Sequence, residues 1–504
     1  MMKKTIFIFA LFLLSFSLPA QEWSIRYSGA YPLGFTRFLD GFIDEDGVTF
    51  LSGQEGADES QCNALLMRIE SDGSHREFIY NKIGHYSKAN CIIEMPNHNL
   101  FVAGNLYDEN DDYFMVLIFD KQLNLLFERQ YEKEVEADSF KDCKATLDHH
   151  GHVIVTTAVA ISNMYQGFDF RGVLFKFDFQ GNMLNSRYLI EDYPNPLYFI
   201  MDYRPRQMWY NENSETLLCL TTGYGGVLSF VSFDSTFNYI GEFPILNDDA
   251  GAPEQTLCRL DSYTDYWYNE DEALFFCGTC DYERDKLRVA RVNTSGEILE
   301  LIQLNERTDT IDDPATRRCM AAVNDNIFYF SFYYHTWKYY PGFACVYQLN
   351  ERQEIVGRHI DDDHDRYRAS LILPTSDYGC ITVNDSCSYE SISQIRHPVI
   401  RKLTLEDFEH VPLTIGEQHT GLDDKTSMPF PNPTEGTLNI PLPCFEQQVR
   451  CRICDSKGII ATDRIVASDT QLLQFDVSKL KNGLYHYQIY TPNKTLLQGK
   501  FVKK

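Results

Sequence analysis

The sequence has few basic residues for its length. Its 504 residues include 45 Lys and Arg against 72 Asp and Glu, which gives a formal net charge of −27. A protein without excess cationic surface cannot displace the counterions of phosphate groups, so we exclude nucleic acid as a partner. Acidity of this size keeps an exported protein soluble, and it also supplies the oxygen ligands that calcium prefers.

Long apolar runs are absent after residue 20, so we expect no transmembrane segment in the mature chain. Residues 1–20 have the pattern of a signal peptide. Lys3 and Lys4 precede the apolar run at 6–14, and Ala20 supplies the small residue of a cleavage site. The sequence therefore predicts an exported protein.

Motifs that carry known catalytic chemistry are also missing. The sequence has no G-x-S-x-G elbow, no H-E-x-x-H helix and no phosphate-binding loop. The thirteen histidines form no metal-ligand cluster, and no second pair completes a zinc site with Cys451 and Cys454. These absences favour a binding protein over an enzyme. We expect most of the fourteen cysteines to be buried thiols, and the sequence leaves any disulfide pairing open.

Helical periodicity is nearly absent, and a repeat of short apolar runs takes its place. Seven repeats close on apolar residues that are 50 to 59 positions apart, namely Ile69, Phe119, Phe177, Phe233, Val292, Leu349 and Leu403. Turn pairs such as Asp46-Gly47 and Asp72-Gly73 separate four strand-like runs in a repeat, and their glycines supply the positive φ angles of tight hairpins. A repeat of this length with four strands is typical of a β-propeller blade.

We therefore predict an all-β fold: a seven-bladed β-propeller over residues 21–413, with six or eight blades as the alternatives. Residues 22–27 form one more strand-like run, which we expect to pair with the last blade and complete the ring. A polar linker at 414–428 then leads to a small antiparallel β-sandwich at 429–504.

The loops of such a propeller differ between its two faces. The loops between the second and third strands, and those between successive repeats, are long and share one face, which we call the loop face. Long loops on a rigid scaffold are the usual place for binding. Five aromatic residues there are candidate contacts for a glycan or protein ligand, with packing of the loops as the competing interpretation: Tyr198, Trp209, Trp337, Tyr339 and Tyr340.

Acidic clusters also fall on the loop face. Asp361, Asp362 and Asp363 are candidate ligands of a calcium ion, although no cluster has the spacing of an EF-hand and solvated charge is the alternative. Suitably spaced carboxylates could also serve a carbohydrate-active hydrolase or lyase. A structural platform that docks a partner is the third hypothesis for the propeller.

The C-terminal residues carry four motifs in order. The motif residues are Pro431, Asn432, Pro433, Gly436, Asp455, Gly458, Leu480, Gly483 and Tyr485, and the chain ends on the basic pair Lys503-Lys504. This segment resembles the C-terminal sorting domain of type IX secretion cargo. The resemblance implies recognition by an outer-membrane translocon, followed by attachment to the cell surface or release. It says nothing about what the propeller binds.

Overall fold

The computed structural model describes residues 22–29, 34–58, 60–108, 111–133, 139–162, 168–189, 204–222, 228–244, 266–269, 273–279, 287–293, 298–304, 311–324, 327–336, 339–361, 366–387, 397–410, 434, 436–441, 449–455, 460–466, 472–491 and 494–504. The chain divides into two compact units, Met1–Leu413 and Thr414–Lys504. Within the described ranges, no helix has the length and apolar character needed to cross a membrane.

The described strands of the first unit form seven antiparallel sheets, which we number in chain order. Sheets 1 and 2 consist of β2 (Phe35–Ile43), β3 (Thr49–Gly56), β4 (Cys62–Ile69) and β5 (His75–Tyr80), then β6 (Tyr86–Glu94), β7 (Leu100–Tyr107), β8 (Asp112–Phe119) and β9 (Leu125–Tyr131). Sheet 3 consists of β10 (Ser139–Phe140), β11 (Lys144–Leu147), β12 (Val153–Ser162), β13 (Phe168–Phe177) and β14 (Met183–Tyr188). Sheet 4 consists of β15 (Arg204–Asn211), β16 (Thr216–Thr222), β17 (Leu228–Asp234) and β18 (Tyr239–Pro244).

The remaining three sheets follow the same order of strands. Sheet 5 consists of β19 (Tyr266–Asn269), β20 (Ala273–Thr279), β21 (Leu287–Val292) and β22 (Ile298–Gln303). Sheet 6 consists of β23 (Ile311–Pro314), β24 (Met320–Asn324), β25 (Ile327–Thr336), β26 (Tyr339–Asn350), β27 (Ile355–Ile360) and, after the short 3₁₀ helix η3 (Leu405–Asp407), β31 (Glu409–His410). Sheet 7 consists of β28 (Arg366–Pro374), β29 (Cys380–Cys387), β30 (His397–Leu403) and β1 (Trp23–Arg26).

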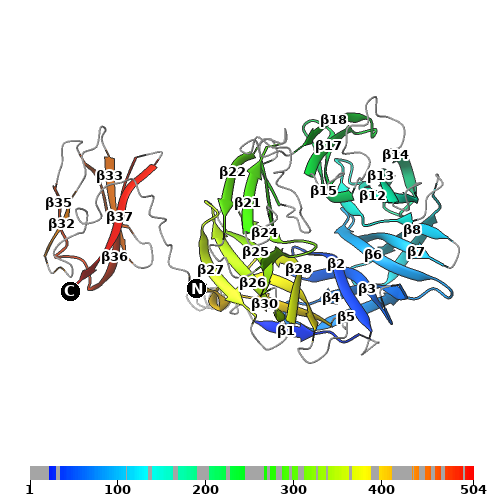
Figure 1. Cartoon of the computed structure of the whole chain (residues 1–504), viewed down its shortest axis with the longest axis horizontal. Helices are drawn as coiled ribbons and strands as arrows, with labels where there is room; N and C mark the ends of the chain where they lie inside the picture. Colours follow the sequence, from blue (N-terminus) through cyan, green and yellow to red (C-terminus); the bar gives the residue numbers. More distant parts are fainter. Residues whose placement is uncertain are drawn as a thin grey trace, which may run out of the picture. The chain divides into compact units, whose positions relative to one another are not determined.

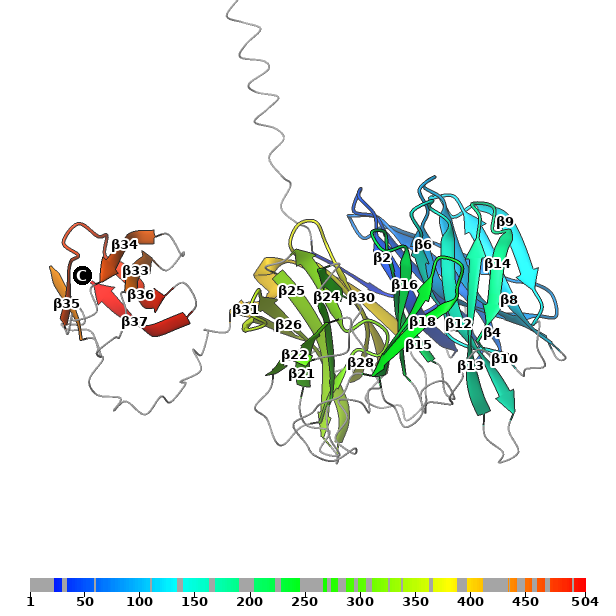
Figure 2. The ribbon, with the colours of Figure 1, turned by 90° about the horizontal axis from the view of Figure 1, so that it is seen from above.

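The sheets follow one another around a common centre in a propeller-like arrangement, with β2, β6 and β28 on the inner side (Figure 1). Figure 2 shows the same strands after a turn of 90° about the horizontal axis. The N-terminal strand β1 pairs with β30, from Trp23 opposite Lys402 to Arg26 opposite Val399, so the start of the chain supplies the outer strand of the last sheet. This confirms the pairing predicted for residues 22–27.

Among the described residues, six of the interfaces between neighbouring sheets hold an apolar core. One cluster joins sheets 1 and 2, and includes Phe50 and Phe119. Another joins sheets 2 and 3, and includes Phe114 and Phe175, whose ring centroids are 4.8 Å apart. Similar clusters join sheets 3 and 4, 5 and 6, 6 and 7, and 7 and 1. Because both faces of a sheet are covered, strands such as β3 are buried along their whole length.

A carboxylate or amide side chain organises many of the tight turns. The Asp44 carboxylate accepts hydrogen bonds from the backbone N–H groups of Asp46 and Val48, and the residue between them, Gly47, has a φ of 79°. The same pattern recurs with Asp120, Asp148, Asp178, Asp234 and Asn350. The turn therefore supports a positive φ even where the residue is not glycine, as at Leu123 (57°).

The first strand of a sheet bulges where it faces a glycine or another small residue of the second strand. The register of β2 against β3 shifts between Phe38 and Asp40, and that of β6 against β7 shifts between Ala89 and Cys91. Opposite these bulges lie Gly53 and Gly104, where an added Cβ would meet the carbonyl oxygens of the first strand. These glycines lie inside β3 and β7, because the bulge leaves no room for a side chain.

The second unit contains two antiparallel sheets. One consists of β34 (Ile460–Val466), β33 (Val449–Asp455), β36 (Gly483–Thr491) and β37 (Lys494–Lys503), and the other of β32 (Thr437–Pro441) and β35 (Leu472–Asp476). Side chains from both sheets share one core, which includes Leu438, Cys451, Phe475 and Phe501. The buried Cys451 occupies an apolar position in this core, as a free thiol readily does.

The bulge gives a testable prediction at Gly104. We expect Gly104→Ala to lower the free energy of unfolding by about 1–3 kcal/mol, because the new methyl group would force β6 away from β7. Gly241→Ala is the matched control, since its Cβ would lie 3.5 Å from the Phe243 ring, an ordinary contact. Denaturant unfolding of both variants measures the difference. Equal stability of the two variants would contradict the steric role of Gly104.

Candidate functional site

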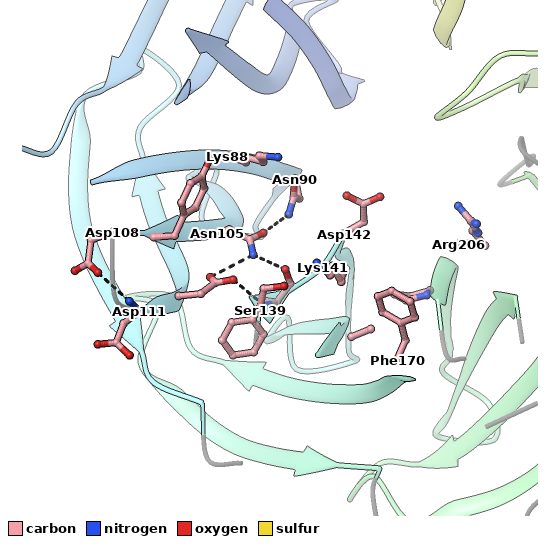
Figure 3. A pocket seen from close by; sticks show the side chains of 15 residues that line it. Lys88, Asn90, Asn105, Asp108, Asp111, Ser139, Lys141, Asp142, Phe170 and Arg206 are labelled. Carbon is pink, nitrogen blue, oxygen red and sulfur yellow. Dashed lines mark hydrogen bonds between the residues drawn. The ribbon is translucent and has the colours of Figure 1, made fainter. Parts of the chain in front are cut away.

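A cavity of about 560 Å³ opens where sheets 2, 3 and 4 meet (Figure 3). Its lining comes from the first strands, from the loop between β7 and β8, and from the neighbouring ends of β12 and β13. The lining residues include Lys88, Asn90, Asn105, Tyr107, Asp108, Asp111, Asp112, Ser139, Lys141, Asp142, Phe170 and Arg206. These strand ends belong to the loop face. A cavity of this size, with several convergent polar groups, suits a small ligand or one unit of a polymer.

A chain of hydrogen bonds forms the centre of the cavity wall. Asn90 Nδ2 donates to Asn105 Oδ1 at 2.6 Å, and Asn105 Nδ2 donates to the carbonyl oxygen of Phe140 at 2.8 Å. The backbone N–H of Phe140 in turn donates to Asp112 Oδ2 at 2.9 Å. These hydrogen bonds therefore link sheet 2 to sheet 3, and they fix the orientation of the polar groups along that wall (Figure 3).

Asp112 is an acid of the cavity whose pKa lies well above its usual range. Burial raises its pKa to about 6, and this effect outweighs the hydrogen bond from the Phe140 N–H, which favours the carboxylate. A carboxyl group with this pKa changes its protonation state within the physiological range. It can therefore donate or accept a hydrogen bond, depending on pH.

Asp142 connects the cavity to the opposite side of the ring. Its Oδ2 lies 2.7 Å from Arg317 Nη1, and Arg317 belongs to the segment between β23 and β24 in sheet 6. The positive charge of Arg317 holds the pKa of Asp142 well below its usual range. Asp142 is thus an ionised acceptor, whereas Asp112 in the same cavity retains its proton to a higher pH.

The basic residues of the cavity all lie near the start of the first strand in three successive repeats. Lys88 lies two residues before Asn90, the extra residue of the β6 bulge, and Arg206 is itself the extra residue of the β15 bulge. Lys141 lies in the break between β10 and β11. Bulges turn side chains out of the regular strand alternation, which explains why Asn90 and Arg206 face the cavity. A basic residue near the start of the first strand in each of these three repeats is the sequence signal that could have pointed to this site.

The structure places the predicted aromatic residues as follows. Trp209 lies in β15, opposite Leu218, and is not among the residues that line the cavity. Tyr339 and Tyr340 begin β26 in sheet 6. Tyr198 and Trp337 lie outside the described residues. Of the acidic run beginning at 108, three members line the cavity: Asp108, Asp111 and Asp112.

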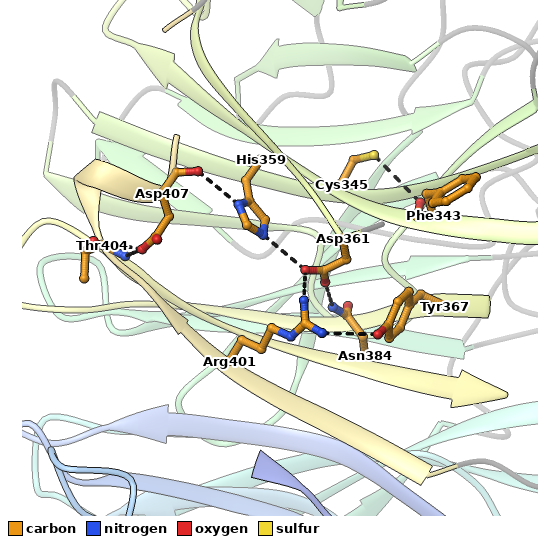
Figure 4. A network of polar contacts seen from close by, with 9 residues as sticks. All are labelled: Phe343, Cys345, His359, Asp361, Tyr367, Asn384, Arg401, Thr404 and Asp407. Carbon is orange, nitrogen blue, oxygen red and sulfur yellow. Dashed lines mark hydrogen bonds and ion pairs between the residues drawn. The ribbon is translucent and has the colours of Figure 1, made fainter. Parts of the chain in front are cut away.

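Asp361, a candidate calcium ligand, lies in a polar network between sheets 6 and 7 (Figure 4). It pairs with Arg401, and it accepts a hydrogen bond from Asn384 Nδ2 at 3.0 Å. Its other neighbour is His359, whose Nε2 lies 3.1 Å from Asp361 Oδ1. Burial lowers the pKa of His359, but the Asp361 carboxylate outweighs burial and leaves that pKa raised.

Asp362 and Asp363 lie outside the described residues, so Asp361 is the one member of the predicted calcium set whose contacts are known. Its carboxylate pairs with the Arg401 guanidinium and accepts a hydrogen bond from the Asn384 amide, and these contacts join two sheets. Over the described part of the chain, no group of three or more His, Cys, Asp and Glu side chains could hold a metal ion.

The C-terminal unit matches a known family over residues 429–504: the secretion system C-terminal sorting domain. Residues 429–504 are a type IX secretion sorting domain. Of its motif, Leu480 packs against the core of the unit, and the Tyr485 hydroxyl donates to the Lys481 carbonyl at 3.0 Å. Gly436, Asp455 and Gly483 lie at the starts or ends of strands, whereas Pro431, Asn432, Pro433 and Gly458 fall outside the described residues.

The sorting domain indicates that the chain is secreted through the type IX machinery and attached to the cell surface. No curated protein matches the sequence. The match to the family model covers residues 429–504 and does not extend over the propeller-like unit.

Solved structures resemble the chain at low identity. A protein of unknown function from Dyadobacter fermentans is 10% identical, with 64% of this chain and 96% of that chain covered and a TM-score of 0.40. The extracellular domain of the putative one component system BT4673 from B. thetaiotaomicron is 11% identical, with 97% and 58% covered and a TM-score of 0.41. The polysaccharide lyase Uly1 is 11% identical, with 78% and 94% covered and a TM-score of 0.45. Likeness at this level carries no argument about activity.

The raised pKa of Asp112 gives a prediction about stability. The folded protein keeps this proton up to about pH 6 whereas the unfolded chain loses it near pH 4, so stability falls as the pH rises between these values. Over this pH range, we expect the free energy of unfolding of Asp112→Asn to fall by roughly 1–3 kcal/mol less than that of the wild type. Urea unfolding at several pH values, compared between wild type and variant, measures it.

Asp72 is the matched control for this experiment. It is exposed, and the hydrogen bond from Ser74 lowers its pKa. The hydrogen bond to the Asp72 carboxylate therefore contributes stability that is lost as the pH falls. Asp72→Asn should remove this contribution, so its effect on the pH dependence should be opposite in sign to that of Asp112→Asn. Identical pH slopes in wild type and Asp112→Asn would show that Asp112 titrates normally.

Proposed function

We propose that this protein is an exported surface receptor whose seven sheets are the blades of one β-propeller, and that it binds a glycan in the cavity between sheets 2, 3 and 4. The observation that carries the proposal is the position of this cavity. It lies on the loop face, and its polar side chains are held in place by contacts between sheets. A pre-oriented set of polar groups reduces the entropy lost when a ligand binds.

The chemistry of the lining suits a polyhydroxylated ligand. Asn90, Asn105 and Ser139 both donate and accept hydrogen bonds, while Asp142 accepts them in its ionised form. Phe170 supplies an aromatic side chain beside these groups. Sugars need this combination, because their hydroxyl groups require donors and acceptors while their ring faces pack on aromatic rings.

The sorting domain supports the location that this function requires. A receptor for an external glycan must reach the outside of the cell, and type IX export provides that route. The signal peptide predicted at residues 1–20 supplies the preceding step across the inner membrane.

The binding prediction compares variants on the two faces. We expect Arg206→Ala and Phe170→Ala to weaken binding of a captured glycan at least tenfold, because each removes a lining side chain. Arg352→Ala and Tyr378→Ala are matched controls in exposed turns at the opposite ends of the strands. A glycan array screened with the full chain identifies the ligand, and calorimetry measures the affinities.

Each outcome of the screen decides between functions. Binding that is lost in the two cavity variants but kept in the controls supports the receptor. Turnover of the captured glycan that is lost in Asp112→Asn would favour the hydrolase or lyase instead, with Asp112 as the proton donor that its raised pKa allows. Binding of a protein and of no glycan would favour the docking platform. Binding that is indifferent to the cavity variants would place the site elsewhere.

Export gives a separate prediction. Deletion of residues 429–504 should leave the chain inside the outer membrane, because the translocon would have no sorting domain to recognise. Protease shaving of whole cells and immunoblotting of the medium measure surface display. Arg206→Ala is the control, since a cavity variant should be displayed normally. Surface display of the truncated chain would overturn the role of the domain.

A further inference from the structure

Two buried cysteines from neighbouring sheets meet next to residues that line the cavity. Cys91 lies in β6 of sheet 2, and Cys143 lies between β10 and β11 of sheet 3. Their Sγ atoms are 3.3 Å apart, although the residues are 52 positions apart in sequence. Cys91 is 0% exposed and Cys143 is 1% exposed.

The positions of the two residues in their sheets are fixed. Each follows directly on a residue that lines the cavity, Asn90 in one sheet and Asp142 in the other. Both belong to the apolar core between sheets 2 and 3, where Phe114 and Phe175 hold the sheets together. The Cys143 Sγ also lies 3.6 Å from the carbonyl oxygen of Ala103, on the strand next to β6. The two thiols are thus directed toward one another by the packing around them.

We propose that Cys91 and Cys143 form a disulfide bond that joins sheets 2 and 3 in the exported protein. An S–S bond is about 2.05 Å long, so the two sulfur atoms need to approach by roughly 1 Å. The predicted signal peptide takes the chain out of the reducing cytoplasm, and the sorting domain directs it on across the outer membrane. Disulfides form and persist in these oxidising compartments.

The oxidation is a thiol–disulfide exchange. Two S–H bonds break and one S–S bond forms between Cys91 and Cys143, while two protons and two electrons pass to a disulfide of an exchange partner, either an oxidoreductase or a small-molecule disulfide. That partner is reduced to two thiols. In the folded protein, burial raises the pKa of the Cys143 thiol and suppresses the reactive thiolate. The exchange therefore belongs to a stage of folding before sheets 2 and 3 close.

The bond would fix the wall of the cavity. Lys88 and Asn90 lie on one side of the cross-link, and Lys141 and Asp142 lie on the other. A covalent link one residue away limits any relative movement of these groups. It also closes a long loop of chain, which restricts the unfolded state and so stabilises the folded one.

Peptide mapping of the full-length protein, collected from the cell surface without reductant and alkylated under denaturing conditions, tests this proposal. We expect one cross-linked peptide pair that contains Cys91 and Cys143 and is lighter than the two thiol peptides by two hydrogen atoms. Cys380, a buried cysteine of sheet 7, should be alkylated as a free thiol in the same sample. Alkylation of Cys91 and Cys143 as free thiols would overturn the proposal.

Thermal unfolding adds a second readout that does not depend on glycan binding. Reductant should lower the Tm of the wild-type protein by roughly 5 °C. It should leave the Tm of Cys91→Ala and of Cys143→Ala unchanged, because neither variant can form the bond. Cys380→Ala is the control for removal of a buried thiol, and its Tm should fall on reduction as that of the wild type does. A Tm of the wild type that is insensitive to reductant would count against the bond.

Discussion

The propeller-like unit depends on how closely the first strand of each sheet approaches the second. At Gly53 and Gly104 the approach is so close that no side chain fits, and the first strand bulges at that point. The bulge changes which side chains face the centre. Asn90 and Arg206, the extra residues of two bulges, line the cavity for this reason. The same local constraint therefore sets both the packing of the sheets and the chemistry of the site.

A consequence is that an acidic protein has basic residues at its centre. Arg37 lies near Asp385, Arg318 near Asp40 and Arg317 against Asp142, each pair joining different sheets. Many of the acids elsewhere have a local role, because turn carboxylates such as Asp44, Asp120 and Asp178 accept backbone hydrogen bonds. Beyond arguing against nucleic acid, the net charge of −27 thus says little about the ligand. The charge that a ligand meets is that of the cavity, where lysine and arginine stand beside aspartate.

The repeat, its turns and the strand that completes sheet 7 could be predicted because they are local. Gly47 and Gly73 adopt the positive φ that their turn pairs require, and β1 has a strand pattern that needed one remaining partner. The cavity could not be derived in this way. Lys88, Lys141 and Arg206 come together through bulges and through sheet packing, which depend on pairing across the fold. The aromatic residues of the loop face were predicted to contact a ligand, yet Trp209 is not among the residues that line the cavity.

The shape of the cavity depends on the interface between sheets 2 and 3. The Asn105 and Asp112 side chains bind the backbone of Phe140 across this interface, and Cys91 meets Cys143 a few residues away. A wall built from two sheets holds its shape only as well as the sheets hold each other. The buried carboxyl group of Asp112, with a pKa of about 6, makes this interface less stable as the pH rises and the group ionises, whereas a disulfide does not respond to pH. For a protein that works outside the cell, a covalent link at this interface therefore keeps the site intact under conditions in which the polar contacts alone would loosen.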